Sequence, residues 1–451
     1  MAGITVTNWF GDLVSHPQVV VEATSVDDII KILKDPDHYP SPVRAVGSNH
    51  STTPVGVAEG GTLIKMGKMN RILEISADTV TVQAGAIAID VAHELQKHGM
   101  QFYVNTEIGS LSVGSASCAG TKDASMPGEY GQVGSYIVGI KMVLPSGEIL
   151  EVTEAQPELI QKVRSCYGLF GIIYEATYRI RKIIPMAVHH TTYKIAEFLE
   201  KLPELQKLGY SMMYYLFPFE DLITVEFRRY NPDAKGEPDS HVWPLRTYMW
   251  ATAGPVFSAQ VETNISNKGV RYKVIDGFCA VWRFKLENLV KSDNTVATDQ
   301  IIKYPPTADN SRYTFSLWAF PEETYPTVLP KYIAFAKKYY KDKGYRNNML
   351  YVGYRILKDR QSLLSYSWDG NVMTIDPVST ANPGWHEFLP VYNQFCADLG
   401  GLALPNQTPH LTRPLVEKGL GERWKQFAAA RRTFDPNNRL LNAYFRELLG
   451  E

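Results

Sequence analysis

The chain has 451 residues, and its 46 lysines and arginines nearly balance 47 aspartates and glutamates, so the net charge is near zero. That balance argues against a nucleic acid or an anionic membrane surface as the main partner. No stretch approaches the roughly 20 apolar residues of a membrane span. The first residues lack the basic and apolar run of a signal peptide, so we expect a cytoplasmic protein. The length favours two or three structural units.

The first informative segment is a β-branched run at residues 43–46 that stops at Gly47 and continues as the polar loop Ser48-Asn49-His50-Ser51. Glycine can adopt backbone angles that other residues avoid. The amide and hydroxyl groups of this loop suit a pyrophosphate, and His50 offers a ring nitrogen to whatever binds beside it. Taken alone, a strand followed by a loop with one histidine is most often plain surface.

The following segments predict strands, one helix and a hairpin. Helical periodicity covers residues 89–98 and ends at Gly99. Residues 137–152 predict a hairpin around the turn Pro145-Ser146-Gly147. Strand-like runs cover residues 62–66, 72–75 and 79–83.

A second loop, residues 109–125, reads GSLSVGSASCAGTKDAS, and nearly every side chain in it is small. A flat ligand can therefore lie against the backbone and be bound by main-chain N–H groups. The strand pattern ends near Ile183-Ile184-Pro185, and a mixed helix and strand region follows to about residue 400. Many of the 26 tyrosines and 8 tryptophans lie between residues 210 and 366; they are either ordinary core or the wall of a pocket.

The four cysteines, Cys118, Cys166, Cys279 and Cys396, are widely spaced and form no C-x-x-C pair. Neither a zinc site nor a disulfide scaffold is indicated, and we expect no metal.

This succession resembles the FAD-binding domain of the vanillyl-alcohol oxidase type, the PCMH-type fold, and more narrowly the aldonolactone and alditol oxidases. Residues 4–9, 66–75, 168–173 and 434–444 resemble further segments of the family in the same order. The resemblance implies an α+β fold with three parts. A PCMH-type FAD-binding domain of two subdomains covers residues 1–184, a mixed α/β substrate-binding cap covers 185–400, and residues 401–451 return to the FAD domain and complete the active site.

The resemblance also implies the cofactor. Residues 47–51 match the G-x-x-H-S pattern of relatives that carry covalent 8α-histidyl FAD, so we expect this linkage at His50; the alternative is a loop histidine over non-covalent FAD. Cys118 is not where doubly linked relatives place a flavin-bonding cysteine, and we expect it to be a small buried residue. Lys122 replaces a usual histidine and either pairs with a phosphate or points to solvent. The FAD neighbours carried over are Val46, Gly47, Ser48, Asn49, His50, Ser51, Ser112, Ser115, Ala119, Gly120, Thr121, Lys122 and Ile173.

The substrate side departs from the alditol oxidases. Their Glu-x-Arg pair on a cap strand reads Gly353-Tyr354-Arg355 here, so the arginine stays and the glutamate is lost. Their substrate-facing lysine is replaced by Arg413. A guanidinium can hold an oxyanion but stays protonated, so Arg413 cannot be the base.

Another group must then accept the hydroxyl proton. Glu107 is our candidate, because it stands where alditol oxidases have a substrate-contacting serine; the alternative is a surface or salt-bridge carboxylate. We expect Arg355 and Arg413 to stabilise developing negative charge. Tyr351, Tyr354 and Asp376 are further candidates on the cap strands.

The function expected from the resemblance is that of an FAD-dependent oxidase. Hydride would pass from a C–H next to an oxygen, in an alcohol, polyol or lactone-type substrate, to flavin N5, and O₂ would reoxidise the flavin to give H₂O₂. The alternatives are a dehydrogenase of a secondary-metabolite substrate with another acceptor, and a non-catalytic flavin-fold binding protein. The expected partners are a small-molecule substrate and O₂, without nucleic acid or membrane.

Overall fold

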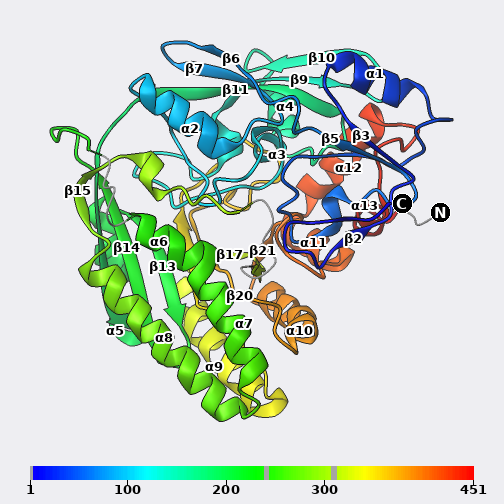
Figure 1. Ribbon diagram of the computed structural model, residues 1–451. Helices are drawn as coiled ribbons and strands as arrows, with labels where there is room; N and C mark the ends of the chain where they lie inside the picture. The colour runs from blue at the N-terminus through cyan, green and yellow to red at the C-terminus, as the bar shows by residue number, and fades with distance from the viewer. Residues whose placement is uncertain (1–3, 238–242, 306–311) are drawn as a thin grey trace.

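The computed structural model describes residues 4–237, 243–305 and 312–451. Two halves, each built around a large sheet, lie side by side (Figure 1). In chain order, the last strand of the first half is β11 (Ile172–Lys182), and the first strand of the second half is β12 (Met186–Lys194). Sheet membership therefore changes at residues 183–185.

A three-stranded parallel sheet in the order β3-β5-β4 opens the first half. Helix α1 (Val26–Lys34) follows β3 and begins with a capping box formed by Ser25 and Asp28. Buried Arg44 of β4 donates hydrogen bonds to the carbonyls of Tyr167 and Leu440, so this sheet is tied to the C-terminal segment. The strands are β3 (Val19–Glu22), β4 (Val43–Val46) and β5 (Thr62–Lys65), and a short pair, β1 (Val6–Thr7) and β2 (Val14–Ser15), precedes them.

An antiparallel sheet in the order β10-β9-β11-β7-β6 forms the rest of the first half, with β8 paired to β11. The small helix α3 crosses beneath β11, where the Tyr178 hydroxyl donates to the Val113 carbonyl at 2.5 Å. The strands are β6 (Ile72–Ile75), β7 (Thr79–Gln83), β8 (Met100–Phe102), β9 (Ile137–Val143) and β10 (Ile149–Thr153). The helices are α2 (Ala88–Lys97), α3 (Val113–Cys118) and α4 (Pro157–Val163).

The second half is built on an eight-stranded sheet in the order β15-β12-β14-β13-β18-β19-β17-β21. All its pairings are antiparallel. The remaining strands are β13 (Ser211–Phe217), β14 (Leu222–Tyr230), β15 (Ser292–Thr295), β17 (Trp318–Pro321), β18 (Tyr351–Ile356), β19 (Val372–Ile375) and β21 (Leu402–Ala403), with β16 (Thr314–Phe315) paired separately to β20 (Val378–Ser379).

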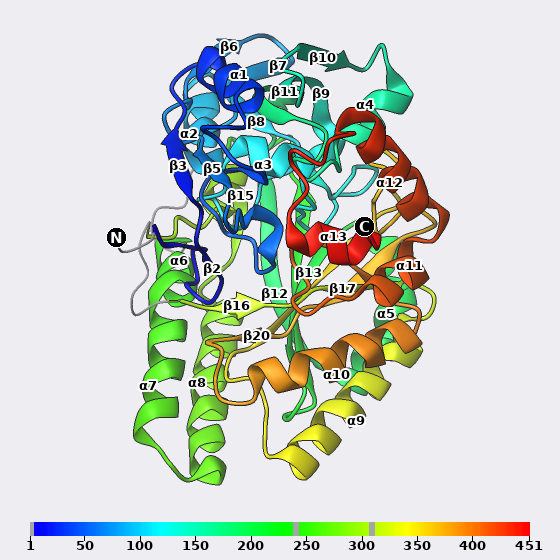
Figure 2. The same ribbon diagram turned by 90° about the vertical axis from the view of Figure 1, so that its right-hand side faces the viewer.

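Helices cover both faces of this sheet, as the turned view shows (Figure 2). All seven residues of β13 are buried, and successive side chains enter different cores. Met213 and Tyr215 pack in the core that contains α8, whereas Met212 and Tyr214 pack in the core that contains α5 and α9. The helices are α5 (Ile195–Leu205), α6 (Trp243–Tyr248), α7 (Gly254–Asn264), α8 (Lys268–Asn288), α9 (Tyr325–Lys343) and α10 (Trp385–Asp398).

The last helices return to the first half (Figure 2). The phenyl ring of Phe427 stacks on that of Phe170, with ring centroids 5.7 Å apart, and Phe445 contacts Tyr167. These helices are α11 (Arg413–Leu420), α12 (Glu422–Phe434) and α13 (Ala443–Leu449). Residues between β21 and α11 thus cross from one half to the other.

The predicted strands, the helix ending at Gly99 and the hairpin are confirmed within one residue at most ends. The small-residue segment 109–125 was expected to be a loop, and this is wrong at its centre, where α3 forms. Within the described ranges, no helix combines the length and apolar character that a membrane crossing requires. No cluster of potential metal ligands occurs there either.

Candidate active site

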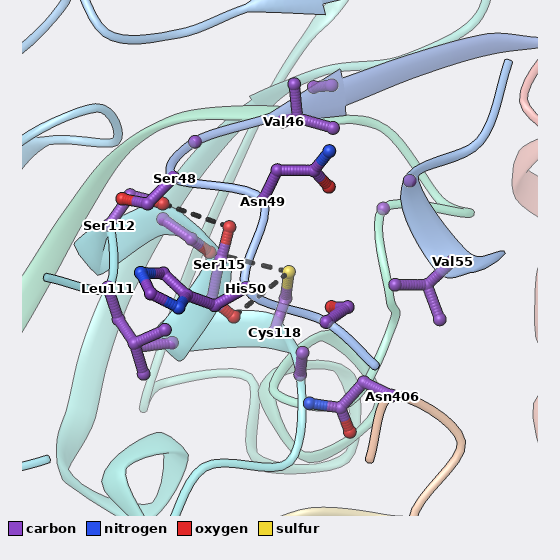
Figure 3. A pocket seen from close by; sticks show the side chains of 18 of the residues that line it. Val46, Ser48, Asn49, His50, Val55, Leu111, Ser112, Ser115, Cys118 and Asn406 are labelled. Atoms are coloured by element: carbon purple, nitrogen blue, oxygen red, sulfur yellow. Dashed lines mark hydrogen bonds between the residues drawn. The ribbon is translucent and has the colours of Figure 1, made fainter. Parts of the chain in front are cut away.

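The two predicted loops meet at a long cavity in the first half, which we call the first cavity (Figure 3). It encloses about 1090 Å³, including its open mouth. Eleven of the thirteen residues expected to contact FAD line it: Val46, Gly47, Ser48, Asn49, His50, Ser51, Ser112, Ser115, Ala119, Thr121 and Ile173.

The loop at residues 47–51 presents its backbone to this cavity. Within the described part of the chain, none of its five backbone N–H groups has a hydrogen-bond acceptor. Asn49 has a φ of 54°, the left-handed conformation that turns successive N–H groups toward one side. Such a concave row of unpaired donors suits a phosphate oxygen.

Gly47 is required for a different reason from the one expected. Its φ is not positive; instead, a Cβ there would lie 1.9 Å from Ser112 Oγ and 2.4 Å from Ser112 Cβ. The two loops therefore pack backbone against side chain. Ser112 donates to Ser115 Oγ at 3.0 Å (Figure 3), and Ser115 is the exposed residue of α3 because it faces the cavity.

His50 is held between the cavity and the N-terminal segment. The indole of Trp9 stacks on its imidazole, with ring centroids 4.8 Å apart. Burial lowers the pKa of His50 to about 4, so the ring is neutral at neutral pH and its nitrogen lone pair is available. Cys118 lies buried at the cavity wall, as expected (Figure 3).

Asn406 and Gln407, from the C-terminal segment, were not predicted individually. Their side-chain amides both donate to the Gly120 carbonyl, at 2.9 and 3.0 Å. This leaves buried Asn406 Oδ1 and Gln407 Oε1 without donors among the described residues. Gly120 therefore holds the C-terminal segment at the cavity wall, although Gly120 itself does not line the cavity.

A second cavity of about 600 Å³ adjoins the first and lies between the two halves. Its own walls combine the aromatic residues Trp250, Tyr304 and Tyr313 with the polar residues Glu107, Lys122, Tyr354 and Asp376. Both cavities share the wall residues Ile108, Leu111, Thr121, Phe315 and Gln407. A flat ring in the first cavity would therefore be reached directly from the second.

Glu107 lies at the wall of the second cavity, and both of its oxygens accept hydrogen bonds. Arg246 of α6 donates to Oε1 at 2.6 Å, and the Tyr354 hydroxyl donates to Oε2 at 2.7 Å. Burial raises the pKa of Glu107, while Arg246 and Tyr354 oppose that rise. Both partners are donors, so both oxygens of Glu107 act as acceptors, as the oxygens of an ionised carboxylate do. Of the alternative expected for Glu107, a surface or salt-bridge carboxylate, the surface position is wrong, whereas the salt bridge is present.

Lys122 takes neither of the two positions expected for it, beside a phosphate or in solvent. Its ammonium lies 3.1 Å from Asp376 Oδ2 and 4.0 Å from the centroid of the Tyr354 ring, and its side chain is 7% exposed. It therefore faces the second cavity and pairs with a carboxylate, not with a phosphate or solvent. Burial raises the pKa of Asp376 to about 6, although Lys122 opposes the rise.

Arg355 and Arg413 line neither cavity, which corrects the expectation that they face a substrate. On β18, Val352 and Tyr354 point to the second cavity, so Arg355 points to the opposite face, where it pairs with Glu322. Arg413 begins α11, is half-exposed and pairs with Glu417. Tyr351 also lies outside the second cavity.

Arg246 and Trp250 were missed by the sequence analysis. Both come from the helical segment after β14, which has no motif, and Trp250 sits on the π-helical turn Met249–Ala253. Such turns are frequent at functional sites, but the sequence carries no signal for them.

Comparison with known proteins agrees with this site. The family described as FAD binding domain matches residues 17–153. L-gulono-1,4-lactone dehydrogenase of Mycobacterium tuberculosis is 23% identical over 447 residues, which is 98% of this chain and 99% of that protein. L-gulonolactone oxidase of Bos taurus is 25% identical over 231 residues, covering 50% of this chain and 51% of that protein.

Among solved structures, cholesterol oxidase from Brevibacterium sterolicum superposes with a TM-score of 0.76 at 16% sequence identity. The match covers 99% of this chain and 96% of that chain, and it shows the same fold. Together with the two adjoining cavities, these findings define an FAD-dependent oxidoreductase. The chain has the α+β fold of the PCMH-type flavoenzymes, and these matches bear out the predicted resemblance to them.

The residues present fit FAD. The unpaired N–H groups of residues 47–51 suit its pyrophosphate, and the small residues of α3 leave room for a flat ring against the backbone. The unpartnered oxygens of Asn406 and Gln407 suit a ligand N–H donor.

Proposed function

We propose that the chain is an oxidase of lactone-type or related hydroxylated substrates. FAD would occupy the first cavity, the substrate would occupy the second, and O₂ would take the electrons to give H₂O₂. The observation that carries this proposal is the shared wall of the two cavities, with Glu107 and Tyr354 facing the second one. The names of the relatives from Mycobacterium tuberculosis and Bos taurus support a lactone.

In this proposal the first cavity holds FAD through residues 46–51, Ser112, Ser115, Ala119, Thr121 and Ile173. When bound, FAD supplies the oxidant that accepts a hydride from the substrate carbon. His50 would form the covalent 8α-histidyl link. Its neutral, buried imidazole supports this role because an unprotonated ring nitrogen is the nucleophile that the bond requires.

Tyr354 and Glu107 would remove the hydroxyl proton of the substrate. Burial and the Glu107 carboxylate raise the pKa of Tyr354 well above its usual range, so the phenol does not ionise by itself. It passes its own proton to Glu107 Oε2, 2.7 Å away, while its oxygen accepts the substrate proton. The substrate hydroxyl O–H bond breaks, and the carboxylate becomes a carboxylic acid.

Lys122 and Asp376 would shape the electrostatics of the same cavity. Two ion pairs adjoin the second cavity, Lys122 with Asp376 and Glu107 with Arg246. The two charges of each pair cancel each other. The cavity therefore suits an uncharged molecule, which a lactone is and its hydrolysis product, an aldonate, is not.

We also propose the division of the chain into an FAD domain (1–184), a cap (185–400) and a returning segment (401–451), in a cytoplasmic protein. The changes of sheet at residues 183–185 and after β21 support the division.

A second candidate is a dehydrogenase with another electron acceptor. It is favoured by the Mycobacterium tuberculosis relative, which matches over almost the whole chain and carries that name.

One experiment separates the two candidates. Purified holoprotein is given L-gulono-1,4-lactone in air, and peroxide formation and dye reduction are measured side by side, with the corresponding aldonate as the matched control. The oxidase predicts peroxide in proportion to lactone consumed. Dye reduction without peroxide would favour the dehydrogenase, and turnover of the aldonate but not the lactone would contradict the proposed substrate class.

A further inference from the structure

A chain of buried charged side chains leads from the second cavity into the cap sheet. Glu107 meets Arg246, and Arg246 Nη2 lies 3.9 Å from Glu226 Oε2 on β14. His190, directly opposite Glu226 on β12, places its Nε2 2.9 Å from the same Oε2 atom. The side chains of His190 and Glu226 are 0% exposed.

The two ring nitrogens of His190 each face a hydrogen-bond acceptor. Its Nδ1 lies 2.9 Å from the carbonyl oxygen of Val290, which can only accept, so Nδ1 must carry a hydrogen. Its Nε2 faces Glu226, whose pKa is held well below the usual range by Arg228 and Arg246 against the opposing effect of burial. An ionised carboxylate can only accept as well. Both ring nitrogens therefore face groups that accept hydrogen bonds, which is the arrangement that an imidazolium satisfies.

Charge balance leads to the same conclusion. Arg228 donates to Glu226 Oε1 and to Asp123 Oδ2, both at 2.6 Å, so it joins the same connected set. That set contains three carboxylates, Asp123, Glu226 and Glu107, but only two guanidinium groups. A protonated His190 makes the set neutral, whereas a neutral ring would leave one buried carboxylate uncompensated, which is costly.

We infer that His190 is a buried imidazolium that positions Glu107 through Glu226 and Arg246. With His190 charged, Glu226 is satisfied by His190 and Arg228, and Arg246 remains available to Glu107. Without that charge, Glu226 draws Arg246 toward itself, and Glu107 loses the partner that keeps it ionised and fixed against Tyr354. His190 touches neither cavity, so it is a positioning residue.

The protonation state can be measured directly on the unmodified holoprotein. Nitrogen-15 NMR of histidine-labelled protein at neutral pH should show one ring with both nitrogens protonated, and this signal should disappear in His190→Gln. His189→Gln is the matched control, because His189 is the adjacent residue on β12 and stacks on Phe227 on the other face of the sheet. A His190 ring with one unprotonated nitrogen would overturn the inference. This measurement does not depend on the proposed function.

The positioning role rests on the proposed function and has its own readout. Besides burial, the groups that act on the proton affinity of Glu107 are Arg246 of α6, Tyr354 of β18, Glu226 of β14, Asp123, and Asp376 with its partner Lys122 in the same cavity. In His190→Gln the acid limb of the rate of flavin reduction should move to higher pH, and the rate on that limb should fall about tenfold for each pH unit that the limb moves. KM for the substrate should hardly change. The His189→Gln profile should match the wild type. An acid limb in His190→Gln that coincides with that of His189→Gln would overturn the positioning role.

Discussion

The indole ring of Trp9 stacks on the imidazole of His50 at an interplanar angle of 27°. Trp9 is fixed at both ends, since its backbone N–H donates to the Asn49 carbonyl at 2.8 Å and its indole N–H donates to the Pro305 carbonyl at 3.0 Å. The N-terminal segment therefore closes the site over His50 and contributes to the burial that keeps the ring neutral.

His50 should be the attachment point of the flavin. In His50→Ala the flavin should be released on acid precipitation, whereas Trp9→Phe should keep the link, because a phenyl ring can still cover the imidazole. Because burial lowers the pKa of His50 to about 4, the ring stays neutral above that value, and the rate of linkage should stay constant from neutral pH down toward pH 4. Flavin fluorescence on denaturing gels measures this. His16→Ala, at an exposed histidine paired with Glu59, is the control. Covalent flavin in His50→Ala would place the link elsewhere.

Gly47→Ala should damage the first cavity. The new methyl group would overlap both Oγ and Cβ of Ser112, so rotating the serine does not relieve the contact. We expect a loss of about 1–3 kcal/mol in the free energy of unfolding and reduced FAD content. Gly67→Ala is a matched control, because a Cβ there meets no atom within 4 Å. The double variant with Ser112→Gly should regain FAD. Normal FAD content in Gly47→Ala alone would show that the loops separate freely.

Tyr354→Phe should slow proton removal without affecting FAD binding. The change removes the hydroxyl that donates to Glu107 Oε2, so we expect flavin reduction to fall by about 10²-fold. Tyr351→Phe on the same strand is the control, because Tyr351 lies outside the second cavity. The two variants are compared by anaerobic stopped-flow absorbance. Equal rates in the two would remove Tyr354 from the proton path.

Asp376 should make the second cavity sensitive to anions at acid pH. Burial raises its pKa to about 6, so the carboxyl group is neutral below that pH and no longer cancels the charge of Lys122. Inhibition by bromide should therefore strengthen as the pH falls through 6. In Asp376→Asn it should be strong at every pH, and in Lys122→Met it should be absent. Inhibition that ignores pH in the wild type would contradict this account.

The parts of the site that lie close together in the sequence could be predicted from it. Residues 46–51 and 112–121 form compact motifs of small and polar residues, and the structure brings them to one cavity. The substrate side is assembled from distant elements, so its pairs, such as Lys122 with Asp376 and Glu107 with Arg246, leave no local pattern.

The sequence contained signals against the two wrong predictions that Arg355 and Arg413 face a substrate. Strand alternation means that Tyr354 and Arg355 cannot both face one cavity. The Thr412-Arg413-Pro414 sequence is typical of a helix start, which places Arg413 in the first turn of an exposed helix.

Glu107 is the residue on which the proposed mechanism depends most. Glu107→Gln keeps the shape of the side chain but cannot accept the proton that Tyr354 passes on. The most direct test is the rate of anaerobic flavin reduction by L-gulono-1,4-lactone in this variant and in the wild type, at equal FAD content. We expect a rate about 10²- to 10⁴-fold lower in the variant. An unchanged rate would contradict the mechanism.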